Sequence, residues 1–527
     1  MIRRYWREGE PYVWASGLAL SLVLLLTALL LYVVIANGIA VFWPRPLALA
    51  ALGDQPAIMG EIMQREPNPA TGQERLQFKI GNRDLYGLDF RWQNAGEIQT
   101  LTFPPEAYVL ERMEYGNFYG FLRGFALNEP AAPGLTLKTA LQSIKGDRHQ
   151  RAALQKEINR QNKQVEKLQH KLAQLEYQGQ GQAARALELR RAKAALETEF
   201  RQTVDRLDQV AGRLRDQKAI FVDAAGTEKA IILDEIVRYY QPNTMSMLAK
   251  TGHYLVKLHE LLFAEPRESN TEGGLFPAIF GTIMLVFLMS ILSFPLGVLG
   301  GIYLREYARQ GVLVRMVRIA VNNLAGIPSI VYGIFGLGFF VYGIGGWVDQ
   351  LFFPERLPTP TFGTGGILWA SLTLGLLTVP VVIVATEEAL GAIPPGIREG
   401  SQALAATKFQ TLVKLLLPMA SPGILTGFIL AMARAAGEVA PLMITGVVKL
   451  APALPLDTSF PFLHLDRKFM HLGFHIYDIG FQSPNVEAAK PMVYVTTLLL
   501  ILIVLIMTST AIALRNRMRK RYAIVDV

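Results

Sequence analysis

Six long runs of apolar residues stand out in the pattern of hydrophobic and polar positions along the chain. They cover residues 14–43, 276–304, 319–348, 367–389, 422–447 and 492–514. About 20 consecutive apolar residues form a helix that crosses the roughly 30 Å hydrocarbon core of a membrane. The pattern therefore predicts a mainly α-helical, polytopic membrane protein with six transmembrane helices. The first run is too long for the apolar region of a signal peptide, so we expect it to be retained as a span.

The segment between the first two runs, residues 44–275, follows a different pattern. Residues 75–125 alternate apolar and polar side chains between Gly, Asn and Pro, which is typical of short strands. Residues 219–222 and 230–233 have the same character on either side of an Ala-Ala-Gly turn. An amphipathic helix near the membrane is predicted from the spacing of Leu248, Leu255, Leu258 and Leu262. These features predict an α+β insertion.

Residues 147–218 are highly charged and repeat apolar side chains at the four-and-three spacing of a coiled-coil seam. The seam comprises Leu154, Ile158, Gln161, Val165, Leu168, Leu172 and Leu175, and then Phe200, Thr203, Leu207, Val210 and Leu214. Gly179 and Gly181 interrupt the pattern, so it predicts an antiparallel coiled-coil hairpin rather than one long helix. The hairpin could be a docking arm for another protein or a self-contained spacer, and the spacing leaves both interpretations open.

Composition and charge give the predicted spans an orientation. Of the 527 residues, 18% are charged, below the roughly 25% of ordinary soluble domains. The absence of cysteine excludes disulfide frameworks, thiolate metal sites and cysteine nucleophiles. Residues 1–13, 305–318, 393–418 and 515–527 together hold 15 basic and 5 acidic residues, which accounts for the net charge of +9. Basic residues in short loops mark the cytoplasmic side, so both termini are predicted to be cytoplasmic and the insertion periplasmic.

These patterns divide the chain into three parts. Residues 1–43 form a cytoplasmic N-terminus and the first transmembrane helix. Residues 44–275 form the periplasmic insertion, which is β-rich and carries the hairpin at 147–218. Residues 276–527 contain the other five transmembrane helices and a cytoplasmic loop at 387–418.

The cytoplasmic loop at residues 387–418 is the most informative stretch. Pro394 and Pro395 favour the start of a short helix, with a break near Thr407, and Pro418 is expected to return the chain to the next span. The apolar stripe of this loop comprises Ile397, Leu404, Ala405, Phe409, Val413 and Leu416. Such a stripe suits insertion into the groove of a partner protein. An amphipathic connector that lies on the membrane surface is the alternative.

The same loop resembles the EAA loop of ABC-importer permeases. That pattern is Glu-Ala-Ala, three residues, Gly, nine residues and Ile-x-Leu-Pro. Here Glu399-Gly400-Ser401 is followed at the same spacing by Ala405 and by Leu415 to Pro418. Four positions differ from the pattern, and the replacements are small-for-small or apolar-for-apolar except for Ser401. Arg398 could pair with Glu399 or contact the partner. The resemblance implies that coupling to an ATPase involves Arg398, Glu399, Gly400, Ser401, Ala405, Leu415, Leu417 and Pro418.

Two further motifs narrow the resemblance. Residues 322–333, Asn-Asn-Leu-Ala-Gly-Ile-Pro-Ser-Ile-Val-Tyr-Gly, resemble the third-span signature of phosphate-specific transport permeases. Residues 433–442, Ala-Arg-Ala-Ala-Gly-Glu-Val-Ala-Pro-Leu, resemble the fifth-span signature of PstA-type subunits. The chain therefore resembles a PstA-type permease, a binding-protein-dependent transport inner-membrane component, in a long form with an extra periplasmic insertion. The resemblance covers the first span and residues 276–521.

Ionisable and polar residues in the predicted spans are candidates for a phosphate path. Arg434 and Glu438 are four residues apart, and charged groups in a span face the bundle interior or a water-filled path. The Arg434 guanidinium offers a fork of donors to phosphate, while Glu438 would hold it or exchange with the anion. An ion pair that only fixes helix packing is the alternative. Asn322, Asn323 and Ser329 could pass phosphate along as neutral donors or hydrogen-bond between helices.

Several motifs of enzymes and metal sites are missing from the sequence. The chain lacks a Gly-x4-Gly-Lys-Ser/Thr phosphate-binding loop, so ATP and magnesium are expected on partner ATPase subunits and this chain is expected to be a transporter subunit, not an enzyme. No metal site is predicted, and His464, His471 and His475 are expected to be surface residues.

The resemblance also implies partners and a location. They are a PstC-type permease, two PstB-type ATPase subunits, a PstS-type periplasmic binding protein, inorganic phosphate and membrane lipid in a bacterial inner membrane, with no nucleic acid. An ABC permease for sulfate or molybdate is one alternative function. A membrane-anchored scaffold or sensor that acts through the hairpin is another.

Overall fold

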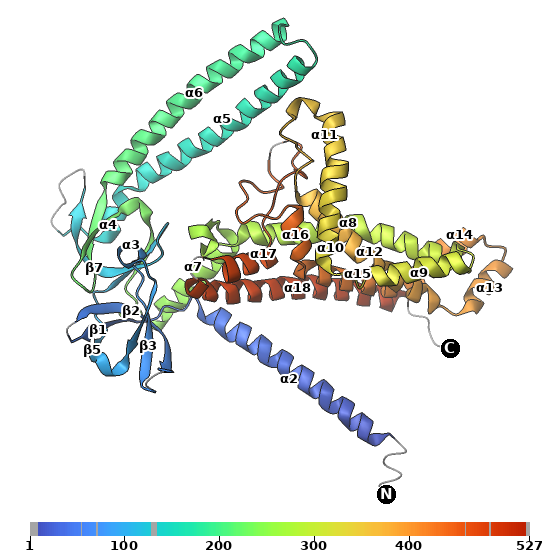
Figure 1. The fold of residues 1–527 in the computed structure, drawn as a ribbon, viewed down its shortest axis with the longest axis horizontal. Helices are drawn as coiled ribbons and strands as arrows, with labels where there is room; N and C mark the ends of the chain where they lie inside the picture. Colours follow the sequence, from blue (N-terminus) through green and yellow to red (C-terminus); the bar gives the residue numbers. More distant parts are fainter. Residues whose placement is uncertain are drawn as a thin grey trace. The chain divides into compact units, whose positions relative to one another are not determined.

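The computed structural model describes residues 9–53, 55–69, 72–127, 134–458, 460–483 and 486–522. The chain forms two compact units (Figure 1). Unit 1 comprises Met1–Phe42, Leu275–Gly345 and Phe362–Val527, and unit 2 comprises Trp43–Gly274 and Gly346–Thr361. The predicted cytoplasmic residues Arg3, Arg4 and Arg7 and the side chain of Arg521 lie outside the described residues.

The described residues contain six helices long and apolar enough to cross a membrane, which agrees with the predicted fold class. They are Glu10–Ala40, Phe276–Tyr307, Ser329–Phe352, Ile367–Gly391, Lys408–Gly437 and Val486–Lys520. The first is α2 and the fourth is α12 (Ile367–Gly391), while the second joins α8 (Phe276–Ile302) to the π-helical η4 (Tyr303–Tyr307). The third joins α10 (Ser329–Phe335), η5 (Gly336–Gly345) and α11 (Gly346–Phe352). The sixth lies in α18 (Val486–Tyr522).

The third predicted span, 319–348, is wrong at its beginning. Residues Val312–Leu324 form a separate amphipathic helix, α9, and the long apolar helix begins only at Ser329. Pro328 explains the break, because proline lacks a backbone N–H and disfavours helical geometry in the residue before it.

The fifth predicted span, 422–447, is wrong at both ends. The helix begins at Lys408 and runs through α14 (Lys408–Thr411), the π-helical η7 (Leu412–Leu416) and α15 (Leu417–Gly437). Pro418 therefore lies within the helix instead of returning the chain to it. The wider π turn just before Pro418 accommodates the missing N–H and the proline ring. At the other end Glu438 is extended, and a short helix α16 (Ala440–Thr445) follows.

Helix α12 lies at the centre of unit 1. In its most apolar 18-residue stretch, 61% of the residues are buried, whereas only 6% are buried in the corresponding stretch of α2. Its neighbours approach closely because they present glycine. A Cβ at Gly297 of α8 would lie 2.6 Å from the Cβ of Val382, and one at Gly427 of α15 would lie 2.2 Å from the Cβ of Ala385. Close packing of small residues is how helices associate in lipid, where no hydrophobic driving force acts between them. This three-helix core positions the breaks described below.

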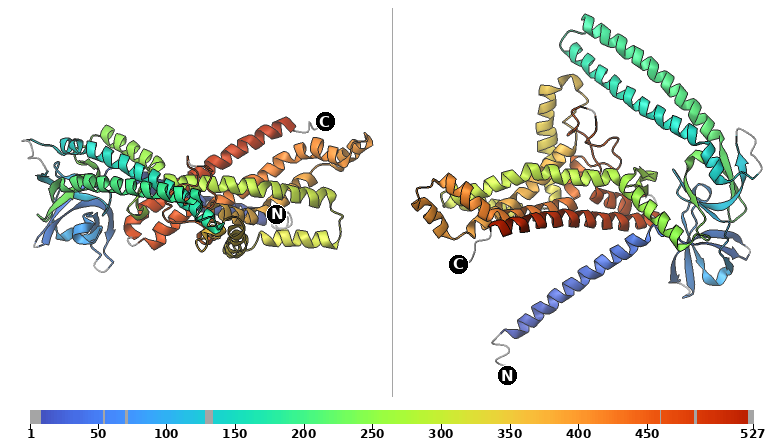
Figure 2. Two further views of the ribbon diagram at one scale, coloured as in Figure 1. Left: turned by 90° about the horizontal axis from the view of Figure 1, so that it is seen from above. Right: turned by 180° about the vertical axis from the view of Figure 1, so that it is seen from behind.

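Two antiparallel five-stranded sheets make up much of unit 2 (Figure 2). The first has the order β4-β3-β2-β1-β5, with β1 (Leu47–Leu52), β2 (Gln55–Pro67), β3 (Glu74–Lys79), β4 (Phe90–Asn94) and β5 (Ile98–Thr102). The second has the order β10-β6-β7-β8-β9, with β6 (Tyr108–Arg112), β7 (Phe118–Ala126), β8 (Lys218–Val222), β9 (Glu228–Ile232) and β10 (Ile236–Tyr240). Strand β8 pairs with β7, so the chain leaves the second sheet before residue 127 and returns to it at Lys218.

The excursion between β7 and β8 is helical. A short helix α4 (Leu137–Ser143) leads into two 33-residue helices, α5 (Lys145–Tyr177) and α6 (Ala184–Asp216), which pack along each other as the heptad spacing predicts. Each is about 50 Å long at 1.5 Å per residue. Leu137 and Leu214 anchor the hairpin in the core of the second sheet.

The hairpin also contacts the segment that follows α11. Here the 3₁₀ turn η6 (Pro354–Arg356) packs on α5. His170 lies 3.5 Å from the Glu355 carboxylate, and Arg356 Nε donates to His170 Nδ1 over 3.3 Å. The sequence places residues 346–361 with 276–527, whereas the contacts group them with the insertion.

Candidate functional site

Two breaks between consecutive helices meet inside unit 1. One separates α9 from α10 at residues 325–328, and the other separates α15 from α16 at Glu438 and Val439. Helices α10 and α16 pack together, and a Cβ at Gly333 would lie 2.7 Å from the Cα of Pro441. The Tyr332 hydroxyl donates to the Leu324 carbonyl over 2.7 Å, which holds the first break closed on α10. Irregular backbone is tolerated at membrane depth only where protein buries it or a cavity is lined by it.

Arg434 connects the two breaks. Its Nε lies 3.5 Å from the Glu438 carboxylate, and its Nη1 donates to the Ala325 carbonyl over 3.5 Å. Both contacts are at the long end of the hydrogen-bond range. The Arg434 side chain is 33% exposed and that of Glu438 20%. The guanidinium is therefore held between the breaks by weak contacts, with a fork of five N–H donors that an anion could engage.

The structure brings together only part of the predicted phosphate path. Arg434 and Glu438 form the expected pair, although Glu438 caps α15 and does not continue its helical face. Asn322 and Asn323 are exposed at the end of α9, outside the third span as the structure defines it, and Ser329 is the first residue of α10. The Ala325 carbonyl was missed by sequence reasoning. Gly326 and Pro328 do indicate that the span is broken here, but they do not show that the Ala325 carbonyl reaches Arg434.

The predicted coupling loop folds as a short helix, α13 (Pro395–Ala403), followed by a turn into α14. Arg398 points back into unit 1. It donates to the Ile393 and Leu390 carbonyls over 2.9 and 2.7 Å and pairs with Glu306 over 2.8 Å. The pairing with Glu399 that the sequence allowed is thus replaced by a pairing with Glu306 of η4. Arg398 holds α13 against the end of the second span.

The turn after α13 has a recognisable helix-capping geometry. Ala405 has φ +60°, in the left-handed region. Its N–H donates to the Gln402 carbonyl over 2.9 Å, and the Ala406 N–H donates to the Ser401 carbonyl over 3.2 Å. This pair of bonds is the Schellman motif, which usually places glycine at the left-handed position. Ala405 occupies the position of the EAA-loop glycine, so the turn keeps that geometry without glycine.

Ala405→Gly is expected to stabilise this turn by about 0.5–1 kcal/mol, because glycine adopts positive φ without steric cost. Slower hydrogen exchange of residues 401–411 in the detergent-solubilised protein would show it. Ala403→Gly, inside the helix, is the matched control and should speed exchange, since glycine disfavours helix interiors. Equal effects of the two substitutions would contradict the left-handed geometry at Ala405.

The outer surface of the loop is apolar. The Leu404 side chain is 85% exposed and that of Phe409 66%, and Glu399 of α13 is exposed as well. Ile397 and Leu416 of the predicted stripe instead pack inward against the cluster of Ile302, Leu390, Ile393 and Leu412. Ser401 and Thr411 hydroxyls, 2.9 Å apart, tie α13 to α14. The loop therefore exposes two large apolar side chains, Leu404 and Phe409, which we call the apolar knob. The contacts of Arg398, Ile397, Leu416 and Ser401 hold the backbone beneath them in place.

Two of the three histidines after α16 differ from the prediction. His471 and His475 are buried, so their expected exposure on the surface is wrong. His471 Nδ1 accepts from the Gly473 N–H over 3.1 Å and caps α17 (Leu472–Tyr477). Burial lowers the pKa of His471 to about 4, so the ring is neutral near pH 7. His464 lies 3.1 Å from Asp457. Within the described residues, no group of three His, Cys, Asp or Glu side chains could hold a metal ion.

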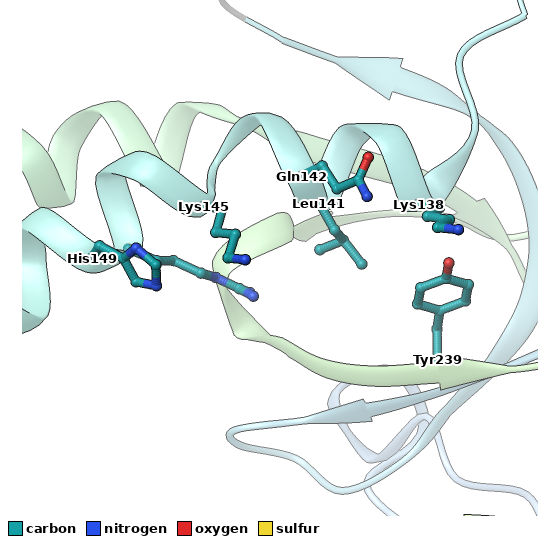
Figure 3. Close-up of a pocket in the computed structure, with 7 residues that line it drawn as sticks. Lys138, Leu141, Gln142, Lys145, His149 and Tyr239 are labelled. Carbon is teal, nitrogen blue, oxygen red and sulfur yellow. The ribbon is translucent and has the colours of Figure 1, made fainter.

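An open pocket of about 430 Å³ lies in unit 2 at the base of the hairpin (Figure 3). It is lined by Lys138, Leu141, Gln142, Lys145, Arg148, His149 and Tyr239. The Lys138 amine and the Tyr239 hydroxyl point toward each other at one end, while Lys145 and His149 lie at the other. Arg148 is already engaged by the Leu233, Asp234 and Ile236 carbonyls. None of the predicted path or coupling residues lines this pocket.

Comparison with known proteins adds independent information. The profile of the family described as "Binding-protein-dependent transport system inner membrane component" matches residues 293–520. The probable ABC transporter permease protein YqgI of Bacillus subtilis is 31% identical over 223 residues, which cover 41% of this chain and 70% of that protein. The probable phosphate transport system permease protein PstA of Methanocaldococcus jannaschii is 35% identical over 189 residues, covering 36% and 60%. The phosphate transport system permease protein PstA of Yersinia pestis is 37% identical over 188 residues, covering 35% and 58%. The chain thus spans about three fifths of the length of these two PstA proteins.

Proposed function

Because the chain belongs to the ABC transporter permeases of the binding-protein-dependent inner-membrane family, we propose that it is the PstA-type permease subunit of an ATP-driven phosphate importer. The names of its PstA relatives and the two span motifs support phosphate as the cargo. The main structural support for the proposal is the position of Arg434, whose positively charged side chain is held between two helix breaks by weak contacts only.

Phosphate would bind at this junction by replacing weak contacts with strong ones. Its oxygens accept charge-assisted hydrogen bonds from the Arg434 fork, which are shorter and stronger than the 3.5 Å contacts to Ala325 and Glu438. The Glu438 carboxylate repels the incoming anion and would separate from Arg434. Both breaks would then be free to move relative to each other. In this way binding at Arg434 would favour one of two states of the bundle, as alternating access requires.

Energy would reach the bundle through the loop that carries Leu404 and Phe409. A rigid helix with an exposed apolar knob suits a groove on a partner, and the EAA-like spacing points to an ATPase as that partner. Arg398 and the Ser401–Thr411 contact would transmit its movement to α8 and to the helix of α14 and α15. We assign ATP and magnesium to two PstB-type subunits, the other half of the path to a PstC-type permease, and delivery of phosphate to a PstS-type protein. The loop would lie in the cytoplasm and the insertion in the periplasm.

Replacing Leu404 and Phe409 together with aspartate is expected to lower ATP-dependent phosphate uptake into proteoliposomes at least tenfold and to release the ATPase subunits on purification. Two apolar anchors of this size contribute about 3–6 kcal/mol when fully buried, and aspartate adds a desolvation cost.

Leu187→Asp on the hairpin is the control, because Leu187 is also an exposed leucine, 44% accessible, but far along the chain from the loop. It should leave uptake unchanged. Normal uptake by the double aspartate variant would rule out this surface as the coupling contact.

A further inference from the structure

Helix α7 (Met247–Phe263), within unit 2, turns its polar side toward the second sheet. Lys257 Nζ lies 2.9 Å from the Glu111 carboxylate, and Glu260 pairs with Arg238 over 3.1 Å. His253, one turn before Lys257, packs its ring on Tyr240 at 4.4 Å between centroids. These side chains are mostly buried. The ionic side of the helix is therefore its inner side, the reverse of an ordinary surface helix.

The outer side of α7 is apolar. Leu248 is 84% exposed, Leu255 58% and Phe263 63%, and Met247, Val256 and Leu258 are exposed with them. The exposed residues of the helix include no Lys, Arg, Asp or Glu. The polar residues among them are Thr251 and His259, and the His259 ring packs on Phe263 with centroids 4.9 Å apart. A contiguous apolar face of this kind is uncommon on water-facing surfaces and marks a protein or membrane contact.

Two contacts within unit 2 fix α7 near the ends of two membrane helices. Near its middle, Tyr254 packs on Trp43, with ring centroids 6.3 Å apart, and Trp43 follows the end of α2 by three residues. At its C-terminus a short β hairpin folds back on it. The Gly274 N–H donates to the Glu265 carbonyl over 3.0 Å, and Gly274 is so close that a Cβ there would lie 2.2 Å from the Ala264 carbonyl oxygen. Helix α8 begins two residues later.

These two points define the direction of the helix. The first span ends and the second span begins on the same face of the membrane, because they are consecutive. Residues 254 and 264 are about 15 Å apart along a helix at 1.5 Å per residue, and both lie close to that face. A helix held at two such points runs along the membrane surface. Trp43 and Tyr254 are also the residue types enriched in the interfacial region of bilayers.

We propose that α7 is an interfacial helix whose apolar side, centred on Leu248, Leu255 and Phe263, is embedded in the lipid of the membrane face on which the insertion lies. The occupant of this surface is the bilayer itself. Helices of this type bury their apolar face at the boundary of headgroups and acyl chains. The inference goes beyond transport and holds whatever anion the permease carries, because it depends only on α7 and the two adjacent spans.

The absence of cysteine from the chain makes a direct test possible. A nitroxide spin label is attached to the new cysteine of the full-length Leu255→Cys or Leu248→Cys variant. The labelled protein is then reconstituted in phosphatidylcholine vesicles. The measured quantity is the ratio of the spin label's collision rate with oxygen, which concentrates in lipid, to its collision rate with a water-soluble nickel chelate. We expect this ratio to be at least threefold higher at Leu255→Cys and Leu248→Cys than at Leu187→Cys on α6. Two labelled positions guard against a local defect at one of them.

Two results would overturn the proposal. Nickel accessibility equal to that of the control would mean that α7 faces water. Low accessibility to both reagents would mean that protein, either another part of this chain or a partner subunit, covers the apolar side. Phosphate transport is not the readout, so failure here would leave the proposed function standing.

Discussion

Arg434→Gln is expected to lower phosphate uptake at least 100-fold while the protein still inserts and folds. Glutamine keeps polarity and much of the length of arginine but loses the charge and the planar fork. Losing two charge-assisted hydrogen bonds to phosphate, at roughly 1.5–3 kcal/mol each, exceeds the approximately 2.8 kcal/mol that a 100-fold change requires. Uptake of radiolabelled phosphate in proteoliposomes with the partner subunits and ATP measures it, and competition by sulfate or molybdate identifies the preferred anion.

The Glu438 partner separates a role in transport from a role in packing. If the ion pair served only to fix α15 against the second break, Glu438→Gln would reduce uptake as much as Arg434→Gln, and the double variant would recover activity. We expect instead that Glu438→Gln keeps more uptake and that the double variant stays as inactive as Arg434→Gln. Arg434→Lys should be intermediate, because lysine retains the charge without the fork. Normal uptake by Arg434→Gln would refute the assignment.

Arg112→Met in the insertion is expected to destabilise the second sheet by about 3–5 kcal/mol, the usual cost of removing one partner of a buried ion pair. Arg112 is 2% exposed and forms two 3.0 Å hydrogen bonds to the Asp84 carboxylate. It also donates to the Gly116 and Tyr115 carbonyls over 3.1 Å. Faster hydrogen exchange in β6 and β7 of the intact protein would report the loss.

The pH dependence of this variant has a defined sign. Burial alone raises the pKa of Asp84, but hydrogen bonds and charge from Arg112, with a further contribution from Lys229, hold that pKa below its ordinary value. In the parent protein this stabilisation is present above the ordinary Asp pKa and is lost as pH falls through the lowered one. Without Arg112 the pKa rises, so the deficit of the variant should shrink on acidification below about pH 4.

Arg123→Met provides the matched control, since Arg123 pairs with Glu228 on the surface, where the two side chains are 63% and 49% exposed. Exposed pairs of this kind contribute less than about 1 kcal/mol. A loss of stability in Arg123→Met as large as in Arg112→Met would show that burial is not the cause.

Sequence patterns predicted the helices of this protein better than their interruptions. The apolar runs locate all six long helices because length and composition decide membrane insertion. They do not show where such a helix breaks, because the run read as 319–348 continues across Pro328 and the run read as 422–447 continues across Glu438. The heptad spacing placed α5 and α6 because their packing is local in sequence. Strands β1 and β2, residues 47–67, carry a weaker alternation and were not predicted.

For the candidate site too, the sequence predicted the local contacts but not the contacts between distant parts of the chain. The Arg434–Glu438 pair follows from a spacing of four residues, which is a local property. The Ala325 carbonyl, by contrast, is 109 residues from Arg434, and only the packing of α10 on α16 brings it near. Arg398 shows the same limit, because its partner Glu306 lies 92 residues away. The turn at Ala405 was not predicted either, because the sequence suggested a break near Thr407 whereas the left-handed residue is Ala405.

The grouping of residues 346–361 with the insertion has a consequence for protein engineering. The backbone passes between the two units four times, not twice, so the insertion is not a cassette that two cuts can remove. Excising residues 43–274 would leave Glu355, whose side chain is 7% exposed, and Arg356 without His170 and the surface of α5. A minimal permease designed from this chain therefore needs a second edit, a new polar connection in place of residues 346–361 between the third and fourth spans.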